Sequence, residues 1–469
     1  MAIASIKKVV ISGPVVGLSV CGIVAALTLN NGIYLFCCFL TLYCILTLLW
    51  RQNRPGILVF AFLMQWTQVV AYVVWMNVLD MDINRLSPHS GTAVIMACLG
   101  ILVMAATLSR SIGPLKVPSD EELVRQARRI NEQKILILYL FSTFFLGGLG
   151  FVLGSSSGLF QILMTFASLK WVFFLVYAYV SWINKKNRVI LAVIILFEFS
   201  TALYSYFSTF KEVILFTIIL ALTFVRKISL KQFLNSLLIV VFVGFLLITW
   251  TAIKGDYRKY LNGGSHQQVV EVSRDAAFSK IGEKIGTLRW EDYQNAMTMF
   301  LYRVQYILHL AKTMDRVPAV MPHEYGGLWW ENISFVLVPR LFNPDKPIYE
   351  ATKKTNKYTG IHYSGFKEGA SFSLGYFADS YIDFGYVGMF FPLAMIALFV
   401  AFIYRSFYNL HKLNILFRYA LINVSLYEYT AFEADGLFLF GRLLLMFLVF
   451  YILGRSVLGP LQKWLYKSN

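Results

Sequence analysis

The residues best suited to chemistry lie between positions 254 and 388, in the one long hydrophilic stretch of an otherwise apolar chain. Within it, Arg340 and Lys346 lie six residues apart, and three prolines surround them: Pro339, Pro344 and Pro347. Because proline restricts its own backbone and that of the preceding residue, such a turn can aim two cations at one point. A pyrophosphate at a membrane surface would need this, and Arg offers it a two-pronged donor. The alternative is an interfacial loop whose cations reach lipid headgroups.

Two carboxylates form a second candidate site. Asp379 and Asp383 lie four residues apart, so on a helix they share a face, with Tyr381 between them. Paired carboxylates can bind a metal ion or supply a general base. The alternative is that they complement the dipole at the start of the membrane helix that follows. We favour this alternative for Asp383, and both interpretations stay open for Asp379.

Charged residues inside apolar runs need an explanation, because each is costly in hydrocarbon. Four lie deep within such runs: Lys170, Glu198, Glu428 and Arg442. For these we expect internal pairing that holds helices together, for example of Glu428 or Glu433 with Arg442. Lys211 and Lys254 lie instead at the outer ends of their runs, where the phosphate of a lipid-linked molecule would sit.

The composition indicates a polytopic membrane protein. Of the 469 residues, 58% are hydrophobic and only 14% charged, whereas a soluble domain is about 25% charged. The net charge of +17 would suggest nucleic-acid binding in a soluble protein. Here the gathering of Lys and Arg in cytoplasmic loops explains it, so we expect no nucleic-acid partner. The five cysteines all lie in apolar runs, which argues against disulfides and zinc sites.

About twelve apolar runs approach the roughly 20 residues that a helix needs to cross a bilayer. They cover residues 9–30, 33–50, 55–79, 91–109, 135–153, 158–184, 189–207, 210–225, 233–254, 386–404, 414–432 and 435–457. Positive charge falls on alternate short loops, which predicts cytoplasmic termini and an outer location for 254–385. The predicted fold is therefore an all-α polytopic integral membrane protein with about twelve transmembrane helices and one large outer loop.

We divide the chain into an N-terminal transmembrane bundle (1–254), the outer loop with the candidate active site (255–385) and a C-terminal bundle (386–469). Inside the loop, apolar residues at helical spacing predict one helix over 292–314 that contains Arg303. Residues 351–370, rich in Lys, Gly and Tyr, are predicted to form a mobile surface loop. Neither a nucleotide-binding loop nor a hydrolase motif is convincingly present.

In their order and topology, the motifs of this chain resemble Wzy-type O-antigen and polysaccharide repeat-unit polymerases, and more remotely the O-antigen ligases. The motifs are Lys-Gly-x-x-Arg at 254–258, an Arg in an apolar stretch at Arg303, Gly326-Gly327, Pro-Arg-x-x-x-Pro-x-Lys-Pro at 339–347, and an acidic-x-Tyr-x-(Asn/Asp)-Phe-Gly-x-x-Gly run at 379–388. The family commonly has Glu where this chain has Asp379, and Asn where it has Asp383.

The resemblance implies transfer of a growing glycan from undecaprenyl pyrophosphate to an incoming lipid-linked repeat unit, at the outer face of the bacterial inner membrane and without metal or other cofactor. The departing pyrophosphate would need cations, and the acceptor hydroxyl a base. The pyrophosphate-binding candidates are Arg258, Arg303, Arg340, Lys346, Lys211 and Lys254. The catalytic candidates are Asp379, His323, Arg340 and Arg303, with Glu350 a weaker candidate for the base.

Aromatic residues of the loop are the candidates for stacking on sugars: Tyr325, Trp329, Trp330 and Tyr381. The two tryptophans are equally suited to anchor the membrane interface. The expected partners are the undecaprenyl-pyrophosphate-linked oligosaccharide, membrane lipids and a chain-length regulator.

Three other functions stay open at this point. An O-antigen ligase performs the same chemistry on a different acceptor, and a test with lipid A core would separate the two. A lipid-linked oligosaccharide flippase or transporter is expected to have inverted repeats and short loops, which this sequence does not show. Polytopic inverting lipid-sugar glycosyltransferases usually place acidic residues in a large first outer loop, which here is short.

Overall fold

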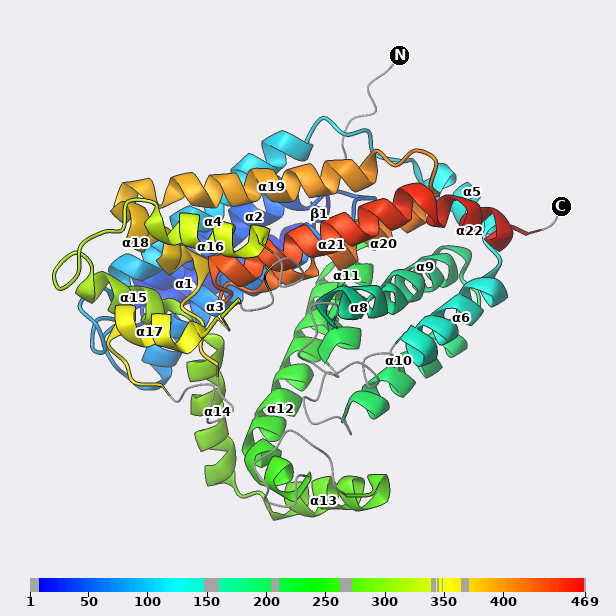
Figure 1. Cartoon of the computed structure of the whole chain (residues 1–469). Helices are drawn as coiled ribbons and strands as arrows, with labels where there is room; N and C mark the ends of the chain where they lie inside the picture. The colour runs from blue at the N-terminus through cyan, green and yellow to red at the C-terminus, as the bar shows by residue number, and fades with distance from the viewer. Residues whose placement is uncertain are drawn as a thin grey trace.

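The computed structural model describes residues 8–146, 160–203, 211–261, 272–338, 343, 346–347, 349–363 and 371–467. Almost all of the regular structure in these ranges is helical, which confirms the predicted all-α class (Figure 1). The strands among the described residues are a parallel pair of two residues each, β1 (Val10–Ile11) and β2 (Lys227–Ile228), and isolated antiparallel bridges join Lys8 to Arg51 and Ile130 to Tyr466. The strand pair joins the start of the chain to the segment before α12 (Leu230–Leu261).

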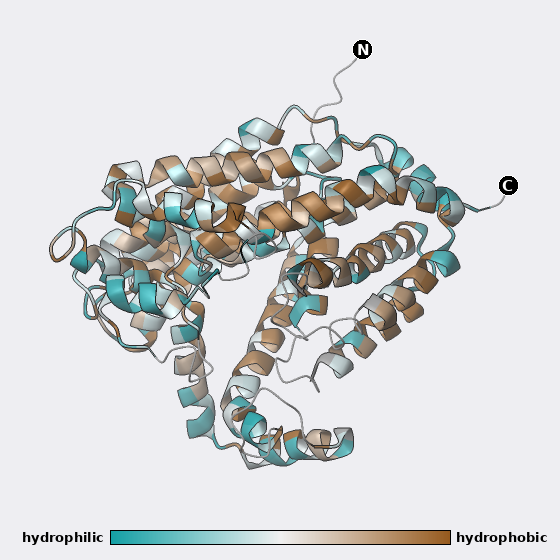
Figure 2. Cartoon of the chain, viewed as in Figure 1, coloured by the Kyte–Doolittle hydropathy of each residue, from teal (hydrophilic) through white to brown (hydrophobic). Residues whose placement is uncertain are grey.

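Seven helical stretches of the described chain are long and apolar enough to cross a membrane. They are α2 (Gly32–Leu49), α3 (Ile57–Val78), α4 (Ser90–Ile112), the stretch Gln161–Asn184 in α8 (Phe160–Ala167) and α9 (Leu169–Asn184), α12, α19 (Phe390–Tyr408) and α21 (Gly436–Ser456). Figure 2 shows their hydrophobic colour along most of α19 and α21. The chain therefore has the helices of a membrane protein.

The other predicted runs also contain helices, but shorter ones. These are α1 (Gly13–Leu27), α6 (Glu132–Phe141) with the π-helical turn η1 (Ser142–Leu146), α10 (Arg188–Leu203), α11 (Lys211–Phe224) and α20 (Ile415–Ser425). The predicted run 414–432 is interrupted, because α20 ends at Ser425 and the short 3-10 helix η3 (Tyr427–Thr430) follows. A count of twelve spans thus stays a prediction.

The centre of the molecule is built around α4, which packs against α2, α3 and α19. Gly100 on α4 permits a close approach, because a Cβ atom there would lie 2.5 Å from the ring of Phe377 in α18 (Tyr376–Gly388). The absence of a side chain therefore lets α18, which precedes α19, lie directly on the bundle. This contact positions the carboxylates of α18 at the end of the core.

The deep charges pair internally, as predicted. Lys170 Nζ lies 3.0 Å from Glu198 Oε2, and Tyr139 donates a 2.6 Å hydrogen bond to the same carboxylate. Arg442 Nη1 lies 2.7 Å from Glu428 Oε2. Each pair joins two different helical elements, so the charges hold helices together at positions where an unpaired charge would be costly.

The predicted helix 292–314 is in fact two helices, α14 (Trp290–Val304) and α15 (Ile307–Arg316), preceded by α13 (Arg274–Thr287). The chain turns at Gln305, whose side-chain oxygen accepts a 3.1 Å hydrogen bond from the N–H of Leu308. At the same turn the N–H of Tyr306 donates to the carbonyl of Gln68 on α3, at 3.2 Å. This break lets α15 turn away from α14 and pack on α4.

The prediction of a mobile loop over 351–370 was wrong for its first part. Residues Ala351–Thr359 form α17, which packs against α15, while 364–370 lie outside the described residues. Thr355 is buried on α17 and donates a 2.8 Å hydrogen bond to the carbonyl of Phe372. The polar composition concealed this helix, because its buried face consists mainly of threonines whose hydroxyls form hydrogen bonds with backbone groups. Figure 1 shows α15, α16 (Gly327–Leu337), α17 and α18 together at one end of the bundle.

Candidate functional site

Four of the predicted cations come together in space, and we call them the cationic cluster: Lys211, Lys254, Arg258 and Arg303. Lys254 lies within electrostatic range of the other three members, and Lys211 lies within range of both arginines. α11 begins at Lys211, and α14 carries Arg303 in its last turn. α12 continues past the predicted end of its run at 254, so Lys254 and Arg258 stay one helical turn apart on one face.

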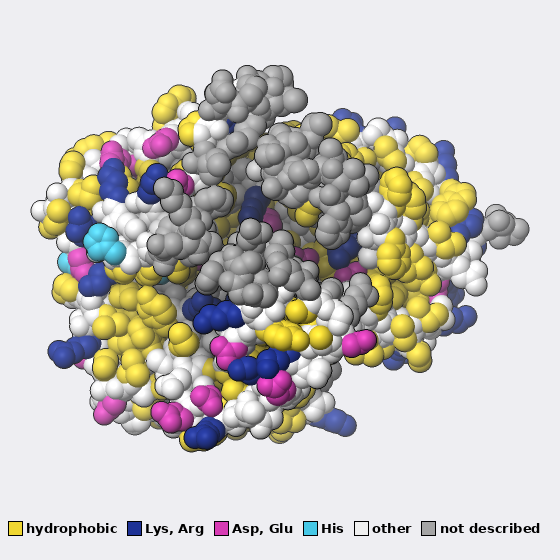
Figure 3. Space-filling model, turned by 60° about the horizontal axis from the view of Figure 1, so that its bottom comes forward, with side chains coloured by type: hydrophobic (Ala, Val, Ile, Leu, Met, Phe, Trp, Pro, Cys, Tyr) yellow, Lys and Arg dark blue, Asp and Glu magenta, His cyan; other side chains and the backbone are white. Residues whose placement is uncertain are grey.

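The cationic cluster has little compensation from the described part of the chain. Within those residues, Lys211, Lys254 and Arg303 form neither a hydrogen bond nor an ion pair. The acidic side chain of Glu433 lies within electrostatic range of Lys211, and it also accepts a hydrogen bond from Gln68. Figure 3 shows a hollow near the middle of the face that it draws, with both basic and acidic side chains in it. The four side chains of the cationic cluster concentrate positive charge, which attracts anions.

An aromatic wall adjoins the cationic cluster, and the sequence analysis did not identify it. Tyr302, next to Arg303 on α14, packs edge-on against Trp75 of α3 at 5.4 Å between ring centroids. The hydroxyls of Tyr302 and Tyr363 lie 3.3 Å apart, and the Tyr363 ring stacks on Phe372 at 4.4 Å. Tyr302 is 37% exposed, so part of this residue is open to solvent on the helix that also carries Arg303.

A second cluster of charges is buried, and Asp379 belongs to it. The Nζ of Lys354, on α17, lies 2.8 Å from Asp379 Oδ1 and 3.1 Å from Asp435 Oδ2. Asp379 also accepts hydrogen bonds from the N–H of Gly436 at 2.8 Å and from the side chain of Asn332 at 3.4 Å. Because both of its oxygens are bonded and it is fully buried, Asp379 ties α17, α18 and α21 together in this conformation.

In this buried cluster the ammonium of Lys354 pairs with two carboxylates, and this arrangement shifts the pKa values of Lys354 and Asp379. Burial raises the pKa of Asp379 to about 6, with the charge of Asp435 acting in the same direction and Lys354 opposing it. Burial lowers the pKa of Lys354, but the attraction of Asp379 and Asp435 outweighs this effect and raises it above its ordinary value. Lys354 therefore remains an ammonium, and the catalytic role of Asp379 stays a prediction.

Asp383 faces a different partner from Asp379. Its carboxylate accepts hydrogen bonds from the N–H groups of Leu328 at 3.0 Å and Trp329 at 2.8 Å, in the first turn of α16. This corrects the expectation that Asp383 complements the following membrane helix, because the dipole that it meets belongs to α16. Since the two aspartates are directed at different groups, they do not form the paired-carboxylate site that their spacing allowed.

His323 has the geometry of a general base. Its Nδ1 lies 3.0 Å from the carbonyl oxygen of Ile382, which makes Nδ1 the protonated nitrogen and leaves the Nε2 lone pair available. Gly385 lies against the other edge of the ring, with a left-handed φ of 67°, and a Cβ atom there would come within 3.4 Å of Nε2. The half-buried ring also packs edge-on against Tyr381 at 5.7 Å.

The predicted sugar-stacking residues divide into two groups. Tyr325 and Trp330 are 82% and 73% exposed, so their rings are open to a ligand or to the membrane interface. Tyr381 is buried and its hydroxyl donates to the carbonyl of Val317 at 2.9 Å. Trp329 is also buried, against Gly436. Trp329 and Tyr381 are therefore packing residues here and present no open ring face to a sugar, contrary to prediction.

The structure describes only part of the turn that the three prolines were predicted to hold. Arg340 lies outside the described residues, together with Pro339 and Pro344. The Nζ of Lys346 donates to the carbonyls of Phe335 and of Val338, the latter at 2.7 Å, at the C-terminal end of α16. There the cation complements the helix dipole. The weaker base candidate, Glu350, pairs with Lys353 at 3.1 Å.

The family model described as "Domain of unknown function (DUF8712)" matches residues 56–453. The chain belongs to this family. The matched range contains the cationic cluster, the buried ion pairs and His323. No curated protein and no solved structure matches the chain.

Besides the aromatic wall, sequence reasoning missed Lys354, Asp435 and His309. His309 lies buried on α15 between the rings of Tyr306 and Tyr363, with centroid distances of 4.4 and 5.5 Å. Within the described residues neither of its ring nitrogens has a hydrogen-bond partner, and burial lowers its pKa to about 4. Helical spacing of the α17 threonines was the available signal for Lys354, whereas no local pattern marks its pairing with Asp435.

Proposed function

We propose that this chain is a polysaccharide polymerase. It would transfer a growing glycan from undecaprenyl pyrophosphate to an incoming lipid-linked repeat unit, at the outer face of the bacterial inner membrane. In this proposal the chain spans the membrane about twelve times, with both termini in the cytoplasm. The observation that carries the proposal is the convergence of the cationic cluster from α11, α12 and α14, at the predicted outer ends of α11 and α12.

The chemistry assigns a role to each part of the site. As the bond between the anomeric carbon and the donor phosphate breaks, negative charge grows on the pyrophosphate, and the cationic cluster stabilises it. A new bond forms between that carbon and the acceptor oxygen, whose proton passes to a base. We assign this base to His323, through Nε2. The aromatic wall at Tyr302 is suited to hold a sugar ring beside the departing phosphate.

A reconstituted assay with the purified full-length chain tests this function. The substrate is an oligosaccharide repeat unit on undecaprenyl pyrophosphate, and the product is a ladder of longer chains. Arg303→Gln should reduce chain growth on the order of 10²-fold, because it removes one donor from the departing phosphate. Lys259→Gln is the control, since this exposed lysine also lies on α12 but is not part of the cationic cluster.

Two results would contradict the proposal. One is chain growth by Arg303→Gln at the rate of the unmodified chain, which would remove the cationic cluster from the reaction. The other is transfer to lipid A core without any elongation of repeat units, which would make the chain a ligase.

A further inference from the structure

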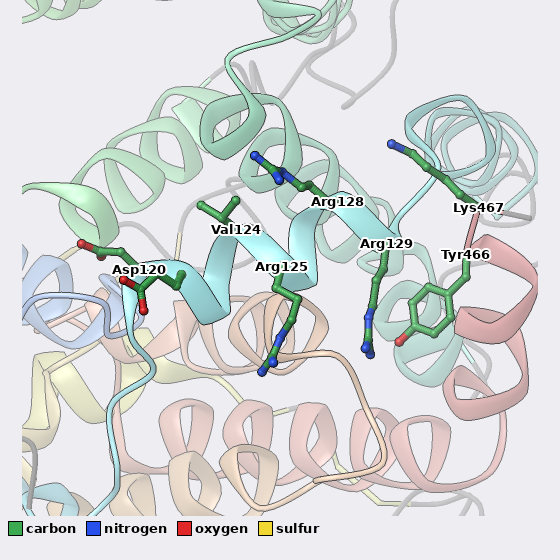
Figure 4. Close-up of a pocket in the computed structure, with 8 residues that line it drawn as sticks. Asp120, Val124, Arg125, Arg128, Arg129, Tyr466 and Lys467 are labelled. Atoms are coloured by element: carbon green, nitrogen blue, oxygen red, sulfur yellow. The ribbon is translucent and has the colours of Figure 1, made fainter. Parts of the chain in front are cut away.

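A pocket of about 1020 Å³ lies beside the short helix α5 (Asp120–Arg129), on the predicted cytoplasmic side of the chain. None of the residues assigned to the proposed reaction lines it. Its walls come from α5 and from the C-terminal segment: Asp120, Glu121, Val124, Arg125, Arg128, Arg129, Tyr466 and Lys467. Figure 4 shows Arg125 and Arg129 directed to the same side of α5, with the ring of Tyr466 beside Arg129.

The basic side chains of this pocket have no acidic partner among the described residues. The three arginines and Lys467 are exposed and form no ion pair there. At the opposite end of α5, Asp120 is already paired with Arg226 at 2.7 Å, and it also accepts a hydrogen bond from Asn53. The pocket therefore holds a surplus of positive charge at the end where Arg125 and Arg129 lie.

A helix cap, apolar packing and a backbone hydrogen bond hold the walls of the pocket in place. The Ser119 side chain caps α5 by accepting a hydrogen bond from the N–H of Glu122 at 3.2 Å, and Leu123 and Ala127 bury the opposite face of the helix. At the other end, the N–H of Lys467 donates to the carbonyl of Arg129 at 2.9 Å. These contacts hold the C-terminal segment against α5, so the arginines point outward over a defined wall.

Neighbouring side chains have the character of a lipid–water interface. Trp464, on α22 (Leu458–Leu465), is 49% exposed. Lys134 Nζ lies over its ring at 5.1 Å and donates to its carbonyl at 2.6 Å. Exposed Trp beside Lys is typical of headgroup depth. In addition, α22 directly follows the membrane-crossing candidate α21, and α5 follows α4.

We propose that this pocket binds the phosphate group of an anionic phospholipid, with Arg125 and Arg129 donating to it. Two guanidinium groups on one helix face suit a phosphodiester, because each can donate two parallel hydrogen bonds. A basic pocket on the predicted cytoplasmic side, beside short segments that follow the membrane-crossing candidates α4 and α21, has the chemistry for anionic headgroups. Free phosphate has the same anionic chemistry but lacks acyl chains, so experiment can separate the two sources.

Native mass spectrometry of the purified full-length chain tests the proposal, with phosphatidylglycerol and phosphatidylcholine of identical acyl chains as probes. The unmodified chain should retain phosphatidylglycerol in preference. Arg125→Gln/Arg129→Gln should weaken that binding on the order of 30-fold, from two lost surface charges. Lys185→Gln/Lys186→Gln removes the same charge from exposed lysines outside the pocket, and should leave the preference unchanged. Arg125→Lys/Arg129→Lys should restore part of it.

Three outcomes would overturn the proposal. The first is equal retention of the two lipids by the unmodified chain. The second is an equal loss in the arginine and lysine double variants, which would indicate a general charge effect. The third is displacement of phosphatidylglycerol by equimolar inorganic phosphate, which would make this a free-phosphate site. Thermal unfolding of each variant, unchanged from that of the unmodified chain, ensures that the comparison concerns binding.

Discussion

Lys354 and Asp379 form a buried ion pair, with Lys354 Nζ 2.8 Å from Asp379 Oδ1 and 3.0 Å from Oδ2. The pair joins α17, from the segment between the two groups of membrane helices, to α18 at the start of the second group. Asp435 extends the contact to α21 and accepts hydrogen bonds from the N–H groups of Leu374 and Gly375. This single ammonium therefore connects three helices at one end of the bundle.

Replacing Lys354 tests the structural importance of that contact. Lys354→Met should lower the free energy of unfolding by about 3–5 kcal/mol, because two buried carboxylates lose their counterion. Thermal unfolding in detergent measures the loss. Lys353→Met is the matched control, since this neighbour is 78% exposed and should change stability by no more than about 0.5 kcal/mol. Equal melting temperatures for the two variants would show that the pair contributes nothing.

His309 should make the stability of the chain depend on pH. Its pKa is lowered from 6.5 to about 4 by burial, so between these values the unfolded chain binds more protons than the folded one. The stabilisation is complete above pH 6.5 and is lost as the pH falls toward 4, by roughly 3 kcal/mol at most. Unfolding measured at pH 7.5 and at pH 5 should show this loss.

His309→Phe isolates the effect from other titrating groups, including the nearby Asp435. The variant should be as stable as the unmodified chain at pH 7.5, because neither ring nitrogen loses a hydrogen bond within the described structure. It should lose less stability on acidification. His362→Phe, at an exposed histidine, should keep the original pH dependence. An identical acid response in both variants would count against a neutral buried imidazole.

Substitution of His323 tests its assignment as the general base. His323→Ala should slow chain growth on the order of 10²-fold without loss of protein from the membrane. His323→Gln should not restore activity, because an amide can accept a hydrogen bond but does not take up a proton near neutral pH. The readout is the polymer ladder made by purified variants, with His362→Gln as the control. Normal ladders from His323→Ala would move the base elsewhere.

Cysteine labelling tests the predicted topology, in a background where the five native cysteines are replaced by serine. Lys353→Cys should react with a membrane-impermeant maleimide in intact cells, because the position is exposed and predicted to be outside. Lys186→Cys should react only after the cells are permeabilised. The position must be chosen by exposure, since the neighbouring Thr355 is fully buried. Labelling of Lys186→Cys in intact cells would reverse the predicted orientation.

The sequence by itself determined where the long apolar helices lie and that the deep charges are paired within the protein. Every predicted apolar run contains a helix, because a helix satisfies its backbone hydrogen bonds within the segment and needs only a long apolar stretch. The pairing of Arg442 with Glu428 or Glu433 was predictable for a related reason, since a charge in hydrocarbon requires a partner and few are available, and the structure selects Glu428.

Only the tertiary structure decided what surrounds each chemical group. Asp379 and Asp383 share a helix, yet one meets Lys354 and the other meets the first turn of α16, because different elements pack against each carboxylate. Lys354 was hidden in a polar segment whose helix forms against α15 rather than from its own apolar pattern. Helical periodicity reports a residue's neighbours along its own helix, whereas the gathering of Lys211, Lys254 and Arg303 depends on how three separate helices pack.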